Sequence, residues 1–271
     1  MSETIEKFNK HVMQTYGRLP IVLEKGHNDD AVDENGKEYI DFGSGIGTNS
    51  LGYCNDKWAD AVCAQARAIQ HTSNYFYTKV QADFAAKLCE LTGYTDVFFG
   101  NSGAEANECA IKLARKYSFD KYGKGRHTIV TLVNSFHGRT LATLSATGQD
   151  VFHNYFFPFV EGFVNVPAND IDALRKLIAE DKTICAVMFE FVQGEGGVNP
   201  LDKAFVDEIF KLCGENDILT VADEVQTGVG RTGAILTSMR YGVKPDITTL
   251  AKGIAGGVPM LSLIHISEPT R

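Results

Sequence analysis

The sequence predicts an α/β fold in which a mostly parallel sheet is covered by helices on both faces. From about residue 57 onwards, short continuous apolar runs alternate with segments of helical periodicity. Parallel strands buried on both faces have such apolar runs, and the intervening helices supply their crossover connections. The composition supports a sizeable core, because 44% of the 271 residues are hydrophobic and 22% are charged.

Residues 1–56 have a different pattern and are predicted to form an N-terminal segment of their own. Residues 3–16 have the spacing of a helix, and residues 21–42 have the pattern of β-strands around a tight turn at Asn35–Gly36. The glycine-rich stretch DFGSGIG comes next. It is predicted to be a permissive loop beside a ligand or a plain surface loop, since dinucleotide and P-loop spacings are absent.

Residues 57–260 are predicted to form the main domain. The expected strands lie at 96–100, 128–134, 162–167, 185–192, 218–225 and 246–251. The expected helices lie at 57–70, 78–91, 104–117, 170–180 and 202–215. In sheets of this kind ligands bind at the carboxyl ends of the strands, and the charged motifs of this chain follow strand ends.

Charge and composition exclude several classes of function. The formal net charge of −8 argues against a nucleic-acid partner. No apolar stretch approaches the length of a membrane span, and the first residues lack the apolar core of a signal peptide, so we expect a cytoplasmic protein without a membrane partner. The six cysteines are scattered, without a CxxC pair, which favours reduced core thiols.

The first candidate site is the helix start in FFGNSGAE. Asn101 or Ser102 can cap the helix, and Gly103 permits close backbone approach. The free N–H groups of the first turn would suit an anion such as a phosphate. An ordinary capped helix is the alternative.

The second candidate is SFHGRT, which follows a predicted strand. Phe136 could stack on a flat ring, or simply pack in the core. Arg139 could bind a substrate carboxylate, or lie on the surface as a solvated charge. Neither a GxSxG nucleophile turn nor an HExxH metal motif occurs, so no serine-hydrolase site and no metal site is predicted.

The third candidate is FEFVQGEGG. Glu190 and Glu195 flank a strand end and a glycine turn. Carboxylates there could accept hydrogen bonds from a substrate amine or orient their neighbours. Solvated acids of a turn are the alternative for both.

The fourth candidate is a pair of charged residues in apolar surroundings. Asp223 closes the run ILTVAD, and Lys252 lies between DITTLA and a glycine-rich turn. A buried charge is costly without a partner. An amine and a carboxylate in one crevice suit pyridoxal phosphate, since the amine bonds the cofactor and the carboxylate keeps its pyridine nitrogen protonated.

Taken in order, SGAEANE, FHGRT, QGEGG, DEVQTGVGRTG and LAKG resemble the class III (subgroup II) pyridoxal-phosphate aminotransferases of fold type I. The resemblance covers residues 1 to about 260 and implies a homodimer. It places residues 1–56 in a small domain and residues 57–260 in a large, incomplete cofactor-binding domain. The opening VMQTYGRLPIVLEKG, together with FHGRT, is most similar to family members that act on N2-acetylornithine.

The resemblance also implies a role for each matching residue. Lys252 would bond the cofactor and shuttle a proton, and Asp223 would pair with the pyridine nitrogen. The other cofactor contacts implied are those of Ser102, Gly103, Ala104, Phe136, His137, Val225 and Gln226. Arg139 would contact the acylated substrate, and Glu195 would gate the two half-reactions. Ala104 departs from the family, which often has a threonine there.

The implied reaction is transfer of an amino group from N2-acetylornithine, an acylated diamino acid, to 2-oxoglutarate. Ornithine, succinylornithine or 4-aminobutyrate aminotransferase remain alternatives, as does glutamate-1-semialdehyde aminomutase. A fragment that keeps the fold but binds nothing is a non-enzymatic alternative.

Residues 261–271, LSLIHISEPTR, do not continue the pattern and resemble a translated sequencing-library adapter. The family continues for more than a hundred residues past the lysine, so the chain as given is expected to fold poorly and to be an inactive fragment. Because LSLIHIS alternates apolar and polar residues, we expect it to occupy the sheet position of the missing antiparallel strand.

Overall fold

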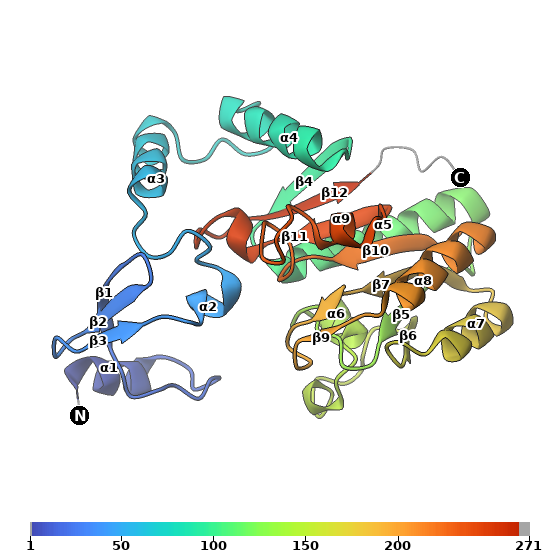
Figure 1. Cartoon of the computed structure of the whole chain (residues 1–271), viewed down its shortest axis with the longest axis horizontal. Coiled ribbons are helices and arrows are strands. Elements are labelled where there is room, and N and C mark those ends of the chain that lie inside the picture. The colour runs from blue at the N-terminus through green and yellow to red at the C-terminus, as the bar shows by residue number, and fades with distance from the viewer. Residues whose placement is uncertain (1, 266–271) are drawn as a thin grey trace. The chain divides into compact units, whose positions relative to one another are not determined.

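The computed structural model describes residues 2–265 and divides the chain into two compact units, one up to Thr72 and one from Ser73 (Figure 1). In the first unit, helix α1 (Glu3–His11) begins at Ser2, whose side chain accepts from the Thr4 N–H. The helix ends five residues before the predicted end, because the backbone becomes extended at Val12.

The rest of the first unit is a small antiparallel sheet, a short turn and a helix. Strands β1 (Leu23–His27), β2 (Asp30–Asp33) and β3 (Glu38–Ile40) pair in sequence order, as the predicted turn at Asn35–Gly36 requires. Segment α2 (Ser44–Gly47) is a turn with left-handed dihedrals at Gly45 and Ile46, so the glycine-rich stretch is a loop. Helix α3 (Asp56–Ala68) follows.

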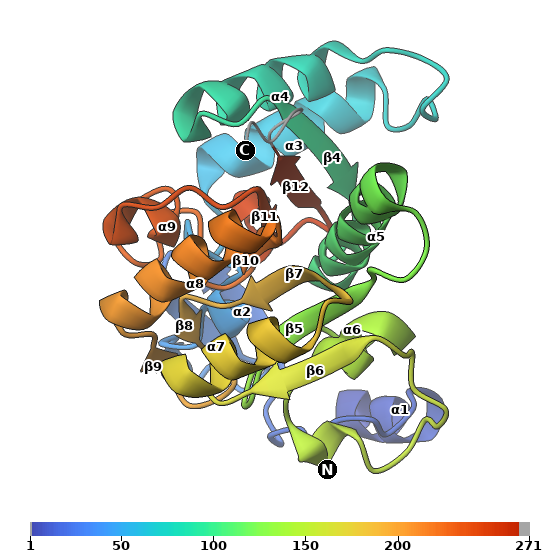
Figure 2. The same cartoon turned by 90° about the vertical axis from the view of Figure 1, so that its right-hand side faces the viewer.

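The second unit contains a seven-stranded sheet in the order β4-β12-β11-β10-β7-β5-β6 (Figure 2). Its strands are β4 (Asp96–Gly100), β5 (Thr128–Leu132), β6 (Phe163–Val166), β7 (Ile184–Phe189), β10 (Leu219–Asp223), β11 (Ile247–Leu250) and β12 (Leu261–His265). Only β12 runs antiparallel to the others. The predicted α/β fold with a mostly parallel sheet is confirmed.

Helices cover this sheet on both faces. Helix α5 (Gly103–Tyr122) packs on β11 and β12, with Ala110, Ile111 and Ala114 in the core. Helices α7 (Ile171–Glu180) and α8 (Lys203–Asn216) cover the opposite face. The residues of β7 are divided between the two clusters and alternate between them from Ala186 to Phe189, which is why the sequence of this strand is continuously apolar.

Shorter elements complete the unit, and several of them were not predicted. Helix α4 (Lys79–Thr92) was predicted and packs on β4. The unpredicted elements are α6 (Leu141–Ala146), α9 (Thr237–Tyr241), the 3-10 turns η1 (Asp150–Phe152) and η2 (Lys252–Ile254), and the hairpin of β8 (Val192–Gln193) and β9 (Asn199–Pro200).

Strand β12 is formed by the first part of the foreign-looking tail. It pairs with β11 on one side and β4 on the other, and the side chains of Leu263 and Ile264 are buried. The prediction that this segment occupies the antiparallel position is therefore confirmed for residues 261–265. Residues 266–271, also part of that prediction, lie outside the described residues.

One side chain of β12 fits its surroundings poorly. Ser262 is fully buried, and its hydroxyl has no hydrogen-bond partner among residues 2–265. Ser262→Ala is expected to raise the free energy of unfolding by about 1 kcal/mol, because it removes a buried polar group that nothing satisfies. Urea denaturation measures the change.

A matched control is Ser145→Ala, which should destabilise the fold, because the Ser145 hydroxyl accepts the Val160 N–H and donates to the Leu141 carbonyl. A destabilised Ser262→Ala variant would contradict this description of β12.

Candidate functional site

The predicted site residues of the second unit follow the carboxyl ends of five strands. Ser102 and Gly103 follow β4, Phe136 and His137 follow β5, and Glu190 follows β7. Asp223 closes β10, and Lys252 comes two residues after β11. Because these strands run the same way, their carboxyl ends lie at one edge of the sheet.

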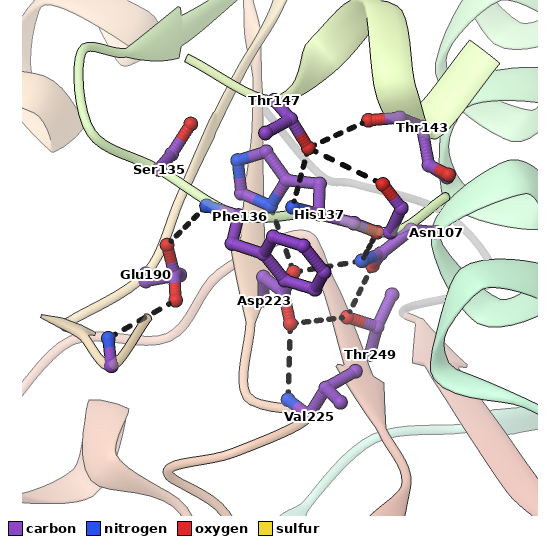
Figure 3. Close-up of polar contacts among 12 residues, drawn as sticks. Asn107, Ser135, Phe136, His137, Thr143, Thr147, Glu190, Asp223, Val225 and Thr249 are labelled. Carbon is purple, nitrogen blue, oxygen red and sulfur yellow. Dashed lines mark hydrogen bonds and ion pairs between the residues drawn. The ribbon is translucent and has the colours of Figure 1, made fainter. Parts of the chain in front are cut away.

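Asp223 is the most heavily bonded group of the site (Figure 3). Its side chain is only 4% exposed. Oδ2 accepts from Asn107 Nδ2 at 2.7 Å and lies 2.8 Å from His137 Nδ1. Oδ1 accepts from the Val225 N–H at 3.0 Å and lies 3.5 Å from the Thr249 hydroxyl, whose one hydrogen goes to Asn107 Oδ1 at 2.8 Å. The carboxylate is thus held in one orientation by hydrogen bonds from three groups and by contact with Thr249.

His137 is fully buried beside this carboxylate. Burial opposes a charged imidazole, but the hydrogen bond and the charge of Asp223 outweigh it, so the pKa of His137 is raised. Its Nε2 atom is buried and has no partner among the described residues. The His137 backbone N–H donates to Thr147 Oγ1, which holds the main chain in place at this residue.

Lys252 adopts a backbone conformation that is unusual for its residue type. Its φ of 51° lies in the left-handed region, which costs about 1 kcal/mol for a residue with a Cβ and often marks a functional position. Burial lowers the pKa of its amine, and the charges of Glu195 and Asp223 act against that shift. The amine therefore lies close enough to both carboxylates to be influenced by their charge.

The start of α5 lies against the same residues. A Cβ on Gly103 would come within 2.8 Å of Val225 Cγ1 and 3.5 Å of Ala251, the neighbour of Lys252. Ser102 caps the helix, and its hydroxyl is bonded to Glu105. The free groups of the first turn are therefore backbone N–H groups rather than the Ser102 hydroxyl.

Phe136 and Arg139 form a separate part of the site. The Phe136 ring packs edge-on against Phe152, with 5.5 Å between centroids. The exposed Arg139 guanidinium lies 5.6 Å from the Phe136 centroid. Gly138, between them, packs against Ala104, since a Cβ there would lie 2.9 Å from the alanine Cβ.

Two acids from the third candidate motif have different environments. Glu190 is buried, and its carboxylate accepts from the Phe136 N–H at 3.0 Å and the Gly194 N–H at 3.4 Å. Burial raises the pKa of Glu190 to about 7. Glu195 is exposed and accepts from Gln226 Nε2 at 3.4 Å.

Three buried polar residues near the site were not singled out from the sequence. Asn107 bonds to Asp223 from inside a helix, and Thr249 donates to Asn107 from inside a strand, where apolar periodicity hides both residues. Glu224 accepts from the backbone N–H groups of Thr237 and Ser238, and so closes the loop that carries Val225 and Gln226. The one sequence signal for Glu224 was its position, since it is a second acidic residue directly after Asp223 at the end of an apolar run.

Glu190→Gln is expected to flatten the pH dependence of stability. The carboxyl has a pKa of about 7 in the folded protein and about 4.3 when unfolded. The folded state therefore holds a proton that the unfolded state releases, and the free energy of unfolding falls by roughly 3 kcal/mol as the pH rises through this window. The raised pKa of His137 acts in the same direction at higher pH.

Urea titrations at about pH 5 and about pH 8 would measure this slope. Glu195→Gln is the exposed control and should keep the wild-type difference. An unchanged difference in Glu190→Gln would contradict the assignment.

Comparison with known proteins shows the class to which this fold and site belong. The family model described as "Aminotransferase class-III" matches residues 12–271. The chain belongs to this aminotransferase family.

Individual members of this family can be compared with the chain by sequence identity. The acetylornithine aminotransferase of Haemophilus ducreyi is 52% identical over 92% of this chain and 63% of its own length. That of Caldanaerobacter subterraneus is 48% identical over 96% of the chain and 65% of its own length. The chain thus spans less than two thirds of these relatives.

Solved structures give the same family. The ornithine aminotransferase of Toxoplasma gondii matches with a TM-score of 0.93 and 32% identity, over 98% of this chain and 65% of its own. A second structure of that enzyme is described as having partial occupancy of PLP at its active site. The acetylornithine aminotransferase of Elizabethkingia anophelis matches with a TM-score of 0.85 and 31% identity, over 99% and 66% of the two chains.

None of the helices within residues 2–265 is both long enough and apolar enough to span a bilayer.

Proposed function

We propose that the whole protein to which this chain belongs is a pyridoxal-phosphate-dependent aminotransferase that moves an amino group from N2-acetylornithine to 2-oxoglutarate. The observation that carries the proposal is the buried Asp223, which is hydrogen-bonded by Asn107, His137 and Val225 and lies at the same sheet edge as Lys252. The reaction follows from the identity of 45–52% to eight acetylornithine aminotransferases.

The donor set fits the cofactor. An amine with a lowered pKa is available to bond an aldehyde, and a buried carboxylate is available to a protonated ring nitrogen. Of the two carboxylate oxygens of Asp223, Oδ1 can more readily accept a further hydrogen bond, because its contact with the Thr249 hydroxyl is long, at 3.5 Å. The first turn of the 20-residue helix α5 offers N–H groups for a phosphate.

Each residue then has a defined task. When bound, pyridoxal phosphate supplies an electron sink that stabilises negative charge at the substrate Cα. Lys252 Nζ holds the cofactor and afterwards takes and returns the Cα proton. Asp223 keeps the ring nitrogen protonated, and Asn107 and His137 hold Asp223 in place.

The surrounding residues bind and orient. Gly103 and Ala104 donate backbone N–H groups to the phosphate, where Ser102 caps the helix. Phe136 and Val225 would pack against the cofactor ring, and His137 and Gln226 would make the remaining contacts with the cofactor. Arg139 is exposed and thus accessible to the acylated substrate, and Glu195 gates the half-reactions.

Further proposals concern the whole protein. It is cytoplasmic, forms a homodimer, and has residues 1–56 in a small domain and 57–260 in the large one. Residues 261–271 are not native, and the 271-residue chain on its own is an inactive fragment. The share of the relatives that the chain spans, 63% of the Haemophilus ducreyi enzyme and 66% of the Elizabethkingia anophelis structure, supports the fragment proposal.

Cofactor absorbance tests the substrate. In the whole protein, N2-acetylornithine is expected to shift the visible cofactor band and 2-oxoglutarate to restore it, whereas 4-aminobutyrate leaves it unchanged. A response to ornithine alone would favour the ornithine aminotransferases, with which the fold also aligns. No response to any of these amines would overturn the proposal.

A further inference from the structure

Both polar atoms of the Asn107 carboxamide make hydrogen bonds. The side chain lies within helix α5 and is 1% exposed. Nδ2 donates to Asp223 Oδ2 and to the His137 carbonyl, both at 2.7 Å. Oδ1 accepts from the Thr249 hydroxyl at 2.8 Å. An amide has two donor hydrogens on its nitrogen, so the nitrogen is fully engaged.

The surroundings also fix which way the amide points. A flipped amide would set Oδ1 against Asp223 Oδ2 and the His137 carbonyl, which are both acceptors in these contacts. All three partners are satisfied only by a side chain that donates two hydrogen bonds, to Asp223 and to the His137 carbonyl, and accepts one from Thr249. Those partners belong to β10, to β11 and to the loop after β5.

We propose that Asn107 is a positioning residue whose uncharged amide ties the N-terminal half of α5 to Asp223, and so sets the spacing between the phosphate-binding helix start and the carboxylate. The proposal rests on the proposed function and deepens it. Asn107 acts through Asp223, because its donor and the helix start belong to one rigid element.

Charge neutrality is essential at this position. Asn107 bonds the titratable group of Asp223, which is also paired with the His137 imidazole, and the charges of Glu190 and Lys252 act on this pair. An acid at position 107 would put two carboxyl groups within hydrogen-bonding distance, and such a pair holds one proton well above the usual carboxyl pKa. The protonated acid can still donate to Asp223, whereas the ionised acid repels it.

The variant Asn107→Asp therefore gives a pH signature. In the whole protein, its affinity for pyridoxal phosphate should be about 10- to 100-fold weaker at about pH 8.5 than at about pH 5.5, where the protonated acid keeps the bond to Asp223 and loses only the one to the His137 carbonyl. Without cofactor, the unfolding temperature of the variant should fall relative to wild type as the pH rises over this range. The reason is that folding raises the pKa of the new carboxyl, so its ionisation at higher pH favours the unfolded state.

Two further variants make the test specific. Asn107→Ala should weaken cofactor binding to the same extent at both pH values. Asn165→Asp alters an amide that donates to the Thr131 hydroxyl on β5, away from Asp223, and should show no new titration.

The outcomes separate the two proposals. Wild-type protein that binds no cofactor would refute the proposed function, while the cofactor-free unfolding series still tests Asn107. The inference itself is overturned if Asn107→Asp parallels the wild type at every pH. It is overturned equally if that variant fails to fold at about pH 5.5, where the protonated acid retains the bond to Asp223.

Discussion

Replacing Lys252 with alanine is expected to abolish covalent attachment of pyridoxal phosphate and to lower transamination about 10³-fold or more. The reason is that the amine both bonds the cofactor and carries the Cα proton, and the charges of Glu195 and Asp223 act on this amine. Absorbance of the purified whole protein and single-turnover kinetics measure both effects.

The fold should survive this change, which separates chemistry from stability. Lysine and alanine both carry a Cβ, so the left-handed backbone at position 252 is equally strained in either protein. Lys244→Ala is the control. The Lys244 amine donates to the Gly93 carbonyl at the surface, so this variant should keep the visible absorbance band of the bound cofactor. A Lys252→Ala variant that keeps wild-type turnover would contradict the assignment.

Replacing Asp223 with asparagine should lower turnover about 10²-fold or more, because a neutral amide cannot keep the ring nitrogen protonated. It should also destabilise the fold by about 1–3 kcal/mol, since an amide NH₂ next to Asn107 Nδ2 sets donor against donor. Kinetics of the whole protein and urea denaturation check the two effects separately.

The same variant should change the titration of His137. The pKa of this imidazole is raised in the folded protein because the bond to Asp223 and its charge outweigh burial. Its stabilising contribution is present below the unfolded pKa of about 6.5 and is lost as the pH rises through the folded value. Without the charge, burial dominates and the pKa falls, which an NMR titration of the ring detects.

A matched control exists for this substitution. Asp246→Asn alters another buried carboxylate, which accepts from the backbone N–H and hydroxyl of Thr220 at the opposite end of β10. It should destabilise the fold without moving the His137 titration. A shift of equal size in both variants would contradict a direct Asp223–His137 interaction.

Most of the sheet could be predicted because its strands are buried on both faces. The run DVFFG forms β4 with the predicted bounds, and β5, β7, β10 and β11 lie within one or two residues of their predicted starts. The ends were less accurate, because polar residues such as Glu190 continue a strand-like pattern after the hydrogen-bonded ladder has stopped.

The candidate site was predictable where charge interrupts apolar sequence. Asp223 and Lys252 stand out for that reason, and the structure places both at the carboxyl edge of the sheet. Asn107 does not stand out, because an asparagine near the start of a helix resembles a surface residue until Asp223 and Thr249 are known to face it. Long-range hydrogen bonds between elements leave no local pattern.

The left-handed backbone of Lys252 was also beyond sequence reasoning. A glycine follows it, and left-handed residues in turns are usually glycines, yet the positive φ belongs to the lysine. The η2 turn (Lys252–Ile254) that begins with this residue packs beside β12, a contact that sequence alone does not specify.

The most direct test is to reduce the whole protein with borohydride after loading it with pyridoxal phosphate, and to map the modified peptide by mass spectrometry. The structure predicts the phosphopyridoxyl group on Lys252, and loss of that label in Lys252→Ala. Label on a different lysine, with Lys252 unmodified, would contradict the account.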